Sequence, residues 1–125
     1  MIVERVDFIS VPVTDTERSA AWYRDTLGLT EIEHPAGTFP EFRLGDNSFL
    51  YLVDPTKIEG EFKGPNTGPI ALRVADVAEA KAELEGRGVE FLGDVFETSV
   101  CHMAWFADPY GNRFMLHRRY APHES

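Results

Sequence analysis

Apolar and polar positions in the first half of the chain predict a strand, a helix and three more short strands. Residues 6–13 are rich in β-branched side chains, as is typical of a strand. Thr14 and Glu17 form a capping-box pattern, so we expect a helix that begins at Thr14 and ends at Gly28. Within it, three apolar residues recur at helical spacing: Ala20, Tyr23 and Leu27. Further strands are expected at residues 29–34, 41–44 and 48–53.

The same order of elements returns in the second half of the chain. Residues 70–74 have the pattern of a strand, and Asp76 with Glu79 three residues later repeats the helix-start signal. The helix itself is indicated by a stripe of three apolar residues: Val77, Ala80 and Leu84. A further strand is expected at residues 89–92, before the closing hairpin.

A hairpin is expected over residues 101–117. Asp108 and Gly111 suit its tight turn, because aspartate can hydrogen-bond its own turn and glycine tolerates a positive φ. In the strand after the turn, Arg113, Met115 and His117 share one face, and Phe114 and Leu116 share the other. One face must meet the hydrophobic core, and we expect the other to look into a ligand cavity.

The two halves align as copies of one unit, with residues 13–15 matching residues 74–76. An internal repeat of this kind indicates that each half buries its sheet against a twin. We therefore predict one α+β domain over residues 1–125, in which two tandem βαβββ modules form a curved mixed sheet around a cavity. The expected modules are residues 1–53 and 69–120, joined by a proline- and glycine-rich linker at 54–68.

The charge of the chain excludes some classes of partner. Its 125 residues carry 21 acidic against 12 basic side chains, a formal net charge of −9. Because phosphate would be repelled, we expect neither nucleic acid nor a membrane as a partner, whereas a cationic ligand would be attracted. Cys101 is the only cysteine, so no intrachain disulfide can form. The sequence has no long apolar run, and we expect a cytoplasmic protein.

Two stretches resemble the vicinal oxygen chelate superfamily, which includes glyoxalase I, fosfomycin-resistance enzymes, extradiol dioxygenases and bleomycin-resistance proteins. Residues 11–29 resemble the family's opening strand and helix, with the usual aromatic-Tyr-Arg run at residues 22–24 and a Leu-Gly ending. Residues 106–116 resemble its closing hairpin. The resemblance covers nearly the whole chain, and it implies the family fold, a homodimer and a small-molecule ligand.

Metal enzymes of this family usually place four His or carboxylate ligands on the cavity face. The resemblance puts these positions on Phe8, Tyr51, Pro69 and Met115. None of these side chains is a competent ligand for a divalent cation. We therefore predict no metal site and no other cofactor, and a divalent metal would require a relocated site. The four residues are instead expected to contact a bound ligand.

Two histidines are the candidates for catalysis. His117 is expected on the same strand face as Met115, one pleat or roughly 7 Å away, which also makes it a candidate ligand contact. His102 lies in the preceding strand, and the pattern leaves open which face it takes. If both histidines point into the cavity, they could bind a relocated metal or act as acid and base near neutral pH. Otherwise each is a hydrogen-bonded wall residue or lies at the protein edge.

Aromatic surface is the other candidate chemistry. Tyr51 beside Phe8 would stack planar ligands and attract cations, although an apolar plug without a pocket would use the same residues. Arg73, if it lies on the cavity face, would favour a carboxylate or phosphate on the ligand. Glu41 and Arg43 share a face of their strand. They could recognise a polar ligand, but we expect a solvent-facing ion pair.

Three functions are compatible with these patterns. The preferred hypothesis is a metal-independent protein, similar to the bleomycin-resistance branch, that binds a small aromatic or cationic molecule in an aromatic cavity. The alternative is a superfamily enzyme of lyase, isomerase or dioxygenase type, with a relocated acid/base or metal site built on His102 or His117. The third is a structural or regulatory subunit whose own side chains fill the cavity.

Overall fold

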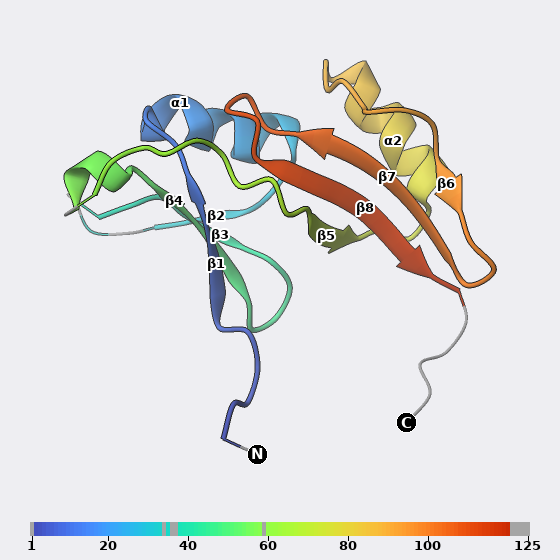
Figure 1. The fold of residues 1–125 in the computed structure, drawn as a ribbon, viewed down its shortest axis with the longest axis horizontal. Coiled ribbons are helices and arrows are strands. Elements are labelled where there is room, and N and C mark those ends of the chain that lie inside the picture. Colours follow the sequence, from blue (N-terminus) through green and yellow to red (C-terminus); the bar gives the residue numbers. More distant parts are fainter. Residues whose placement is uncertain (1, 34, 36–37, 59, 121–125) are drawn as a thin grey trace. The chain divides into compact units, whose positions relative to one another are not determined.

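The computed structural model describes residues 2–33, 35, 38–58 and 60–120, and the chain divides into two compact units (Figure 1). Unit 1 is Met1–Pro65 and unit 2 is Asn66–Ser125. The boundary between them falls within the stretch whose proline and glycine content predicts a linker. Each unit has its own sheet, its own helix and its own core.

Unit 1 contains a four-stranded mixed sheet. Its elements are β1 (Phe8–Pro12), α1 (Thr16–Ala21), the π-helical η1 (Trp22–Thr26), β2 (Glu31–Ile32), β3 (Glu41–Arg43), β4 (Phe49–Val53) and the 3-10 helix η2 (Pro55–Lys57). The strand order is β1-β4-β3-β2, with β1 parallel to β4 and the other pairs antiparallel. Only Glu31–Ile32 of the strand expected at residues 29–34 is regular, and His34 lies outside the described residues.

The helix of unit 1 begins one residue later than the capping pattern predicts. Its N-cap is Asp15, whose carboxylate accepts a hydrogen bond from the Arg18 backbone N–H at 3.0 Å, so the prediction of Thr14 as the cap is wrong. Aspartate caps a helix as well as threonine does, and its charge also favours the helix N-terminus. The predicted end of the helix is confirmed, because Gly28 has a φ of 81° just after the last helical turn.

The core of unit 1 lies between the sheet and the helical segment. Val11, Leu50 and Leu52 alternate along β1 and β4 with more exposed residues, and all three are fully buried. Tyr23 from η1 is also fully buried, and its ring lies 5.8 Å from that of Phe42 on β3. This alternation leaves the other face of the sheet without a helix against it.

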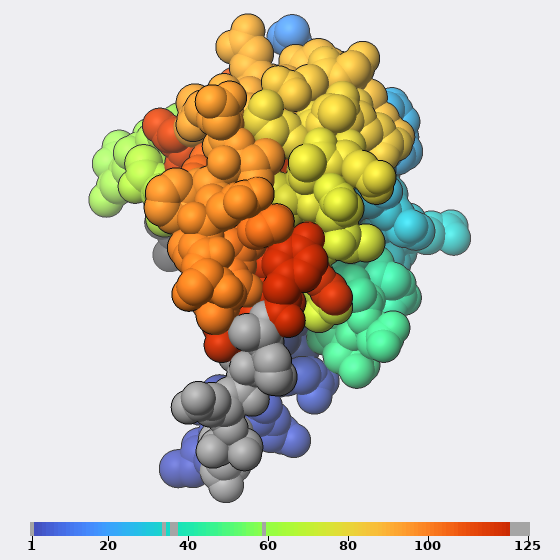
Figure 2. Space-filling view, turned by 90° about the vertical axis from the view of Figure 1, so that its right-hand side faces the viewer, coloured from blue at the N-terminus to red at the C-terminus, as the bar shows by residue number. Residues whose placement is uncertain are grey.

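Unit 2 repeats this arrangement. Its elements are β5 (Ile70–Arg73), α2 (Val77–Gly86), β6 (Phe96–Glu97), β7 (Cys101–Ala107) and β8 (Arg113–Arg119). The strand order is β5-β8-β7-β6, with β5 parallel to β8 and the other pairs antiparallel. Asp76 caps α2 by accepting a hydrogen bond from the Glu79 N–H at 2.9 Å, as its spacing predicts. Figure 2 shows α2 in yellow beside the orange β6–β7 segment.

The strand expected at residues 89–92 is not formed. Within it, Phe91 makes only an isolated bridge to Phe106, and the regular strand β6 lies further along, at Phe96–Glu97. Gly93 follows with a φ of 105°, a conformation that a continuing strand does not use. In this run Val89 is buried and the half-buried Phe91 ring packs 5.3 Å from the Phe106 ring, whereas Leu92 is 49% exposed.

The buried faces of β7 and β8 form the core of unit 2 together with α2. Ala104 and Phe106 on β7 and Phe114 on β8 have no exposed surface, and the two phenylalanine rings stack with centroids 5.6 Å apart. Val77 and Leu84 of α2 are buried against this side. The helix side of the sheet is therefore the face that carries Ala104, Phe106, Phe114 and Leu116.

The turn between β7 and β8 holds a buried polar network. The Asp108 carboxylate accepts hydrogen bonds from the backbone N–H groups of Tyr110 and Asn112, at 2.9 and 2.8 Å, and from the Asn112 side-chain amide at 2.8 Å. The Asn112 side-chain oxygen in turn accepts from the Asn66 N–H at 2.8 Å. Gly111 has a φ of 91°. The predicted tight turn is confirmed, and it also ties the segment before β5 to the hairpin.

Together the two units establish an α+β fold in which each half is a βαβββ repeat with a four-stranded mixed sheet. Helix α2 has 10 residues. Among the residues that the structure describes, no helix has the length and apolar character needed to span a bilayer.

Candidate functional site

The helix-free face of the unit 1 sheet carries Phe8 and Tyr51, the two residues of this unit that the sequence predicts to contact a ligand. Strand register places eight side chains on it: Phe8, Ser10, Pro12, Glu41, Arg43, Phe49, Tyr51 and Val53. We call this set the unit 1 open face. Each of the eight is exposed or half-buried, whereas most of the residues that alternate with them are fully buried: Val11, Phe42, Leu50 and Leu52.

Phe8 and Tyr51 form an aromatic pair on the unit 1 open face. Their ring centroids lie 5.0 Å apart and their planes meet at 74°, an edge-to-face contact. Phe8 is 53% exposed although it is a large apolar residue in a strand. The predicted neighbourhood of these two residues is therefore confirmed, and their rings form surface rather than core.

Glu41 and Arg43 do not pair with each other as expected. The Glu41 carboxylate accepts a hydrogen bond from the Tyr51 hydroxyl, and the Arg43 guanidinium lies over the Phe49 ring, 5.4 Å from its centroid. Strand register explains why the expected ion pair is replaced by these contacts. Glu41 is directly opposite Tyr51, and Arg43 is directly opposite Phe49, across β3 and β4. Each charged side chain therefore contacts the ring opposite it.

The hydrogen bond to Glu41, followed by burial and by the charge of Glu41, raises the pKa of Tyr51 above its usual value of 10.0. The tyrosinate would lie beside a carboxylate, so the neutral phenol is the favoured form. Because the folded pKa is the higher one, Tyr51 contributes stability that is complete below pH 10 and is lost as the pH rises through the folded pKa. At neutral pH this residue is a hydrogen-bond donor and not a base.

We expect Glu41→Gln to lower the pKa of Tyr51 toward its usual value, because the replacement removes the neighbouring negative charge. Tyrosine carbon chemical shifts followed by NMR between neutral and alkaline pH measure this, with Tyr51→Phe used to assign the resonance. Glu17→Gln, on the helix, serves as the charge-matched control and should leave the titration unchanged. An unchanged Tyr51 titration in Glu41→Gln would contradict the assigned hydrogen bond.

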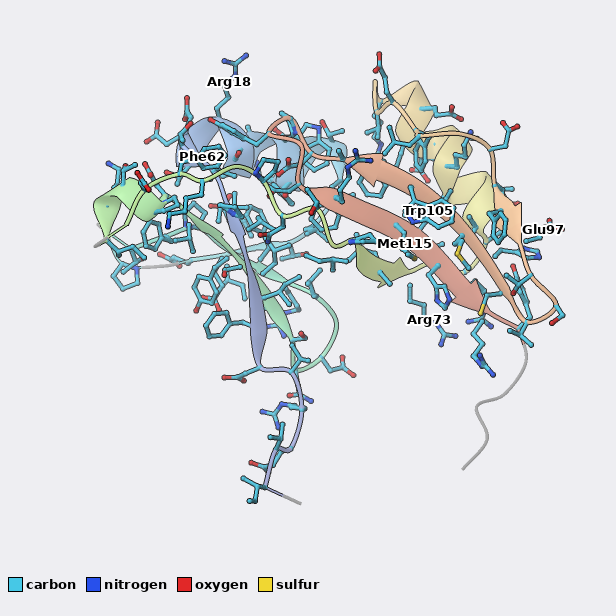
Figure 3. The ribbon with its side chains drawn as sticks, in the orientation of Figure 1. Arg18, Phe62, Arg73, Glu97, Trp105 and Met115 are labelled. Carbon is cyan, nitrogen blue, oxygen red and sulfur yellow. The ribbon has the colours of Figure 1, made fainter. Side chains whose placement is uncertain are left out.

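The unit 2 sheet also has a helix-free face, and the remaining ligand candidates of its strands lie on it. Register from β8 outward gives eleven residues: Ala71, Arg73, Phe96, Cys101, Met103, Trp105, Ala107, Arg113, Met115, His117 and Arg119. We call this set the unit 2 open face. All of them except the buried Cys101 are exposed or half-buried, and Figure 3 shows Arg73 and Met115 on the side of β8 away from α2. Pro69 is exposed just before β5.

The two histidines lie on opposite faces of the unit 2 sheet. His117 is opposite Met103 and belongs to the unit 2 open face, whereas His102 alternates with Met103 and shares the face of the buried Ala104. His102 instead lies 3.7 Å from a Glu97 oxygen, with its ring 4.5 Å from the Tyr120 ring. The sequence leaves open which face of its strand His102 takes, and the structure places it on the helix side. The two histidines therefore do not share a site.

Of two further residues on the unit 2 open face, the sequence suggests Trp105 only as an extension of the aromatic surface and does not suggest Met103 as a site candidate. Trp105 is directly opposite Met115, and Met103 is directly opposite His117. Their strand carries apolar residues on both faces, so its pattern alone does not show which face is the core. The signal that decides this is the burial of Ala104 and Phe106, which only the fold supplies.

The four residues that the family resemblance puts at metal-ligand positions are divided between the two units. Phe8 and Tyr51 are in contact within unit 1, and Pro69 and Met115 belong to unit 2. Within the described part of the chain, no three His, Cys, Asp or Glu side chains are grouped so that they could hold a metal ion.

Comparison with known proteins gives a consistent result. A family model described as the Glyoxalase/Bleomycin resistance protein/Dioxygenase superfamily matches residues 5–116. A search of curated protein sequences found no match. Among solved structures, TnmS3, an antibiotic binding protein from Streptomyces sp. CB03234, is 30% identical, over 95% of this chain and 98% of that chain, with a TM-score of 0.77.

Two further solved structures agree with this assignment. A member of the same superfamily from Sphaerobacter thermophilus DSM 20745 is 28% identical over 94% of this chain and 98% of its own, with a TM-score of 0.78. A glyoxalase/bleomycin resistance protein from Streptomyces sp. CB03234 is 30% identical over 91% of this chain and 100% of its own, with a TM-score of 0.72. Since the family match spans most of the chain and the fold agrees, this protein belongs to the glyoxalase/bleomycin resistance protein/dioxygenase superfamily.

Proposed function

We propose that this protein binds a small aromatic molecule and that it does so without a metal ion. The observation that supports this most directly is the exposed aromatic pair of Phe8 and Tyr51, with ring centroids 5.0 Å apart. Exposed, mutually supported rings offer a planar ligand both stacking and burial of apolar surface. The Tyr51 hydroxyl, held by Glu41, is oriented by the protein before any ligand arrives.

The residues at the family's metal positions do not fit a divalent cation. They offer a phenyl ring, a neutral phenol, a pyrrolidine and a thioether, at Phe8, Tyr51, Pro69 and Met115. Divalent Zn, Mn, Fe and Mg ions prefer imidazole, carboxylate or thiolate donors, and none of these is supplied by the four. The proposed binding therefore rests on aromatic and apolar contacts, and no step passes through a metal.

The likeness to TnmS3 also supports a binding role. That protein is described as an antibiotic binding protein, and its identity to this chain is 30% over almost the full length of both. We extend only the class of function to this chain: the binding of a small organic molecule rather than its conversion. Catalysis by a pair of histidines would need His102 and His117 in one site, and they project from opposite faces of their sheet.

Isothermal titration calorimetry with planar aromatic compounds, including aromatic antibiotics, tests this function. We expect at least one compound to bind with a dissociation constant of about 1–100 μM, and chelator treatment of the protein to leave that affinity unchanged. Metal analysis of protein purified without chelator provides the control. Stoichiometric metal whose removal abolishes binding would replace this proposal with the enzyme alternative, and absence of binding across the panel would refute it.

A further inference from the structure

The side chains of the unit 2 open face are ordered in two adjacent rows across the sheet. In one row Ala71, Met115 and Trp105 are neighbours on β5, β8 and β7. In the next row, two residues along, Arg73, His117 and Met103 occupy the same strands. Adjacent strands lie about 4.8 Å apart and the rows about 7 Å apart, so one small molecule can contact both.

The first of these rows is apolar and the second is cationic at one end. Met115 and the half-buried Trp105 offer a polarisable thioether and an indole face, while the small side chain of Ala71 leaves space beside them. Arg73 is exposed at the end of β5, next to His117. The face thus combines a surface for a planar ring with a guanidinium one pleat away from it.

The charge of this face is opposite in sign to that of the whole chain. Arg73 and Arg113 lie on it, and the strand residues of β5 to β8 on this side, all of them described, include no carboxylate. No described carboxylate of unit 2 forms an ion pair with either arginine. The acidic residues of α2 lie on the other side of the sheet: Glu79, Glu83 and Glu85.

Local charge outweighs net charge for a ligand in contact with this face. At physiological ionic strength charges are screened over a Debye length of about 8 Å, so a carboxylate farther away than this acts weakly on a ligand at the unit 2 open face. A guanidinium in direct contact with a carboxylate forms paired, charge-assisted hydrogen bonds. The net charge of −9, which by itself favours a cationic ligand, therefore does not decide the ligand class here.

We propose that the unit 2 open face selects an aromatic ligand that carries an anionic group, a carboxylate in the simplest case. Arg73 binds the anion, His117 lies beside it, and Met115 with Trp105 contacts the ring. This inference rests on the proposed function, which it narrows to one chemical class of ligand.

The test uses three probes that share one ring system and differ in charge: 2-naphthoate, 2-naphthamide and protonated 2-(aminomethyl)naphthalene. Calorimetry on the full chain should show 2-naphthoate binding about tenfold more tightly than the neutral amide, because only the carboxylate forms charge-assisted hydrogen bonds with Arg73. The ammonium probe should bind most weakly. High salt should reduce the preference for the carboxylate.

Arg73→Met keeps an apolar stem and removes the charge, so it should abolish the preference for 2-naphthoate and leave the affinity for 2-naphthamide unchanged. Arg87→Met makes the same change in net charge, but at the end of α2, and should preserve the preference. Equal affinity for the three probes, a preference for the ammonium, or a preference that survives in Arg73→Met would overturn the inference and leave the proposed function intact. If none of the three probes binds while another aromatic compound does, the inference is refuted and the proposed function is not. If no aromatic compound binds, both the inference and the proposed function are refuted.

Discussion

Asn112→Ala is expected to lower the free energy of unfolding by about 3 kcal/mol, because it removes the centre of a buried hydrogen-bond network. Asn112 has no exposed surface, and Asp108 is only 5% exposed. The alanine would deprive the Asp108 carboxylate of a donor at 2.8 Å and the Asn66 N–H of its acceptor at 2.8 Å. Each buried polar group left unpaired costs about 1–3 kcal/mol.

Urea denaturation followed by circular dichroism measures this change. Asn47→Ala is the matched control, since Asn47 is an exposed asparagine in the turn between β3 and β4, and it should change stability by less than about 0.5 kcal/mol. A loss below about 1 kcal/mol in Asn112→Ala would show that the network contributes little to stability. The Asp108–Asn112 turn would then be only a connection.

Removal of both rings of the unit 1 open face is the second change with a large expected effect. Phe8→Ala combined with Tyr51→Ala should weaken binding of a neutral aromatic compound about 100-fold, or about 2.7 kcal/mol. One buried aromatic side chain contributes about 1.5–3 kcal/mol, and each of these rings is partly exposed before the ligand binds. Calorimetric titration with a neutral aromatic compound that the binding panel identifies measures the loss.

Two controls separate the rings from other effects. Tyr51→Phe keeps the ring and removes only the hydroxyl, so most of the affinity should remain. Tyr120→Ala removes another exposed aromatic ring, which is 51% exposed and packs on His102 outside both open faces, and should leave the affinity unchanged. If the double variant binds that neutral compound as tightly as the unchanged protein, Phe8 and Tyr51 are not its binding surface.

Features that depend on neighbouring residues could be predicted from the sequence. The cap at Asp76, the positive φ at Gly28 and the turn at Asp108 each involve residues within a few positions of one another. Local hydrogen bonds and backbone preferences govern such features, and these are encoded in short stretches. The exchange of Thr14 for Asp15 as the first cap shows the limit of this method: two adjacent residues were both suitable, and the geometry of the helix start selected one.

Features that depend on which face of a strand is buried could not be predicted in the same way. Strand β7 carries apolar side chains on both faces, so its alternation is compatible with either orientation of His102. The burial of Ala104 and Phe106 on the helix side of the sheet fixes the orientation of His102. In the same way Phe91 is apolar enough for a strand, but it packs half-buried against Phe106 and forms only an isolated bridge.

The sequence by itself determined the repeat of two βαβββ units, the turns and the family, because hydrophobic periodicity and turn formation depend on residues that are close together in the sequence. Only the tertiary structure decided that Glu41 holds Tyr51, that Arg73 lies beside His117, and that His102 is separated from them. These relations join residues from different strands, and hydrogen-bonded register fixes them together with the choice of the face that packs on the helix. That choice is made by the burial of the whole unit and not by any one segment.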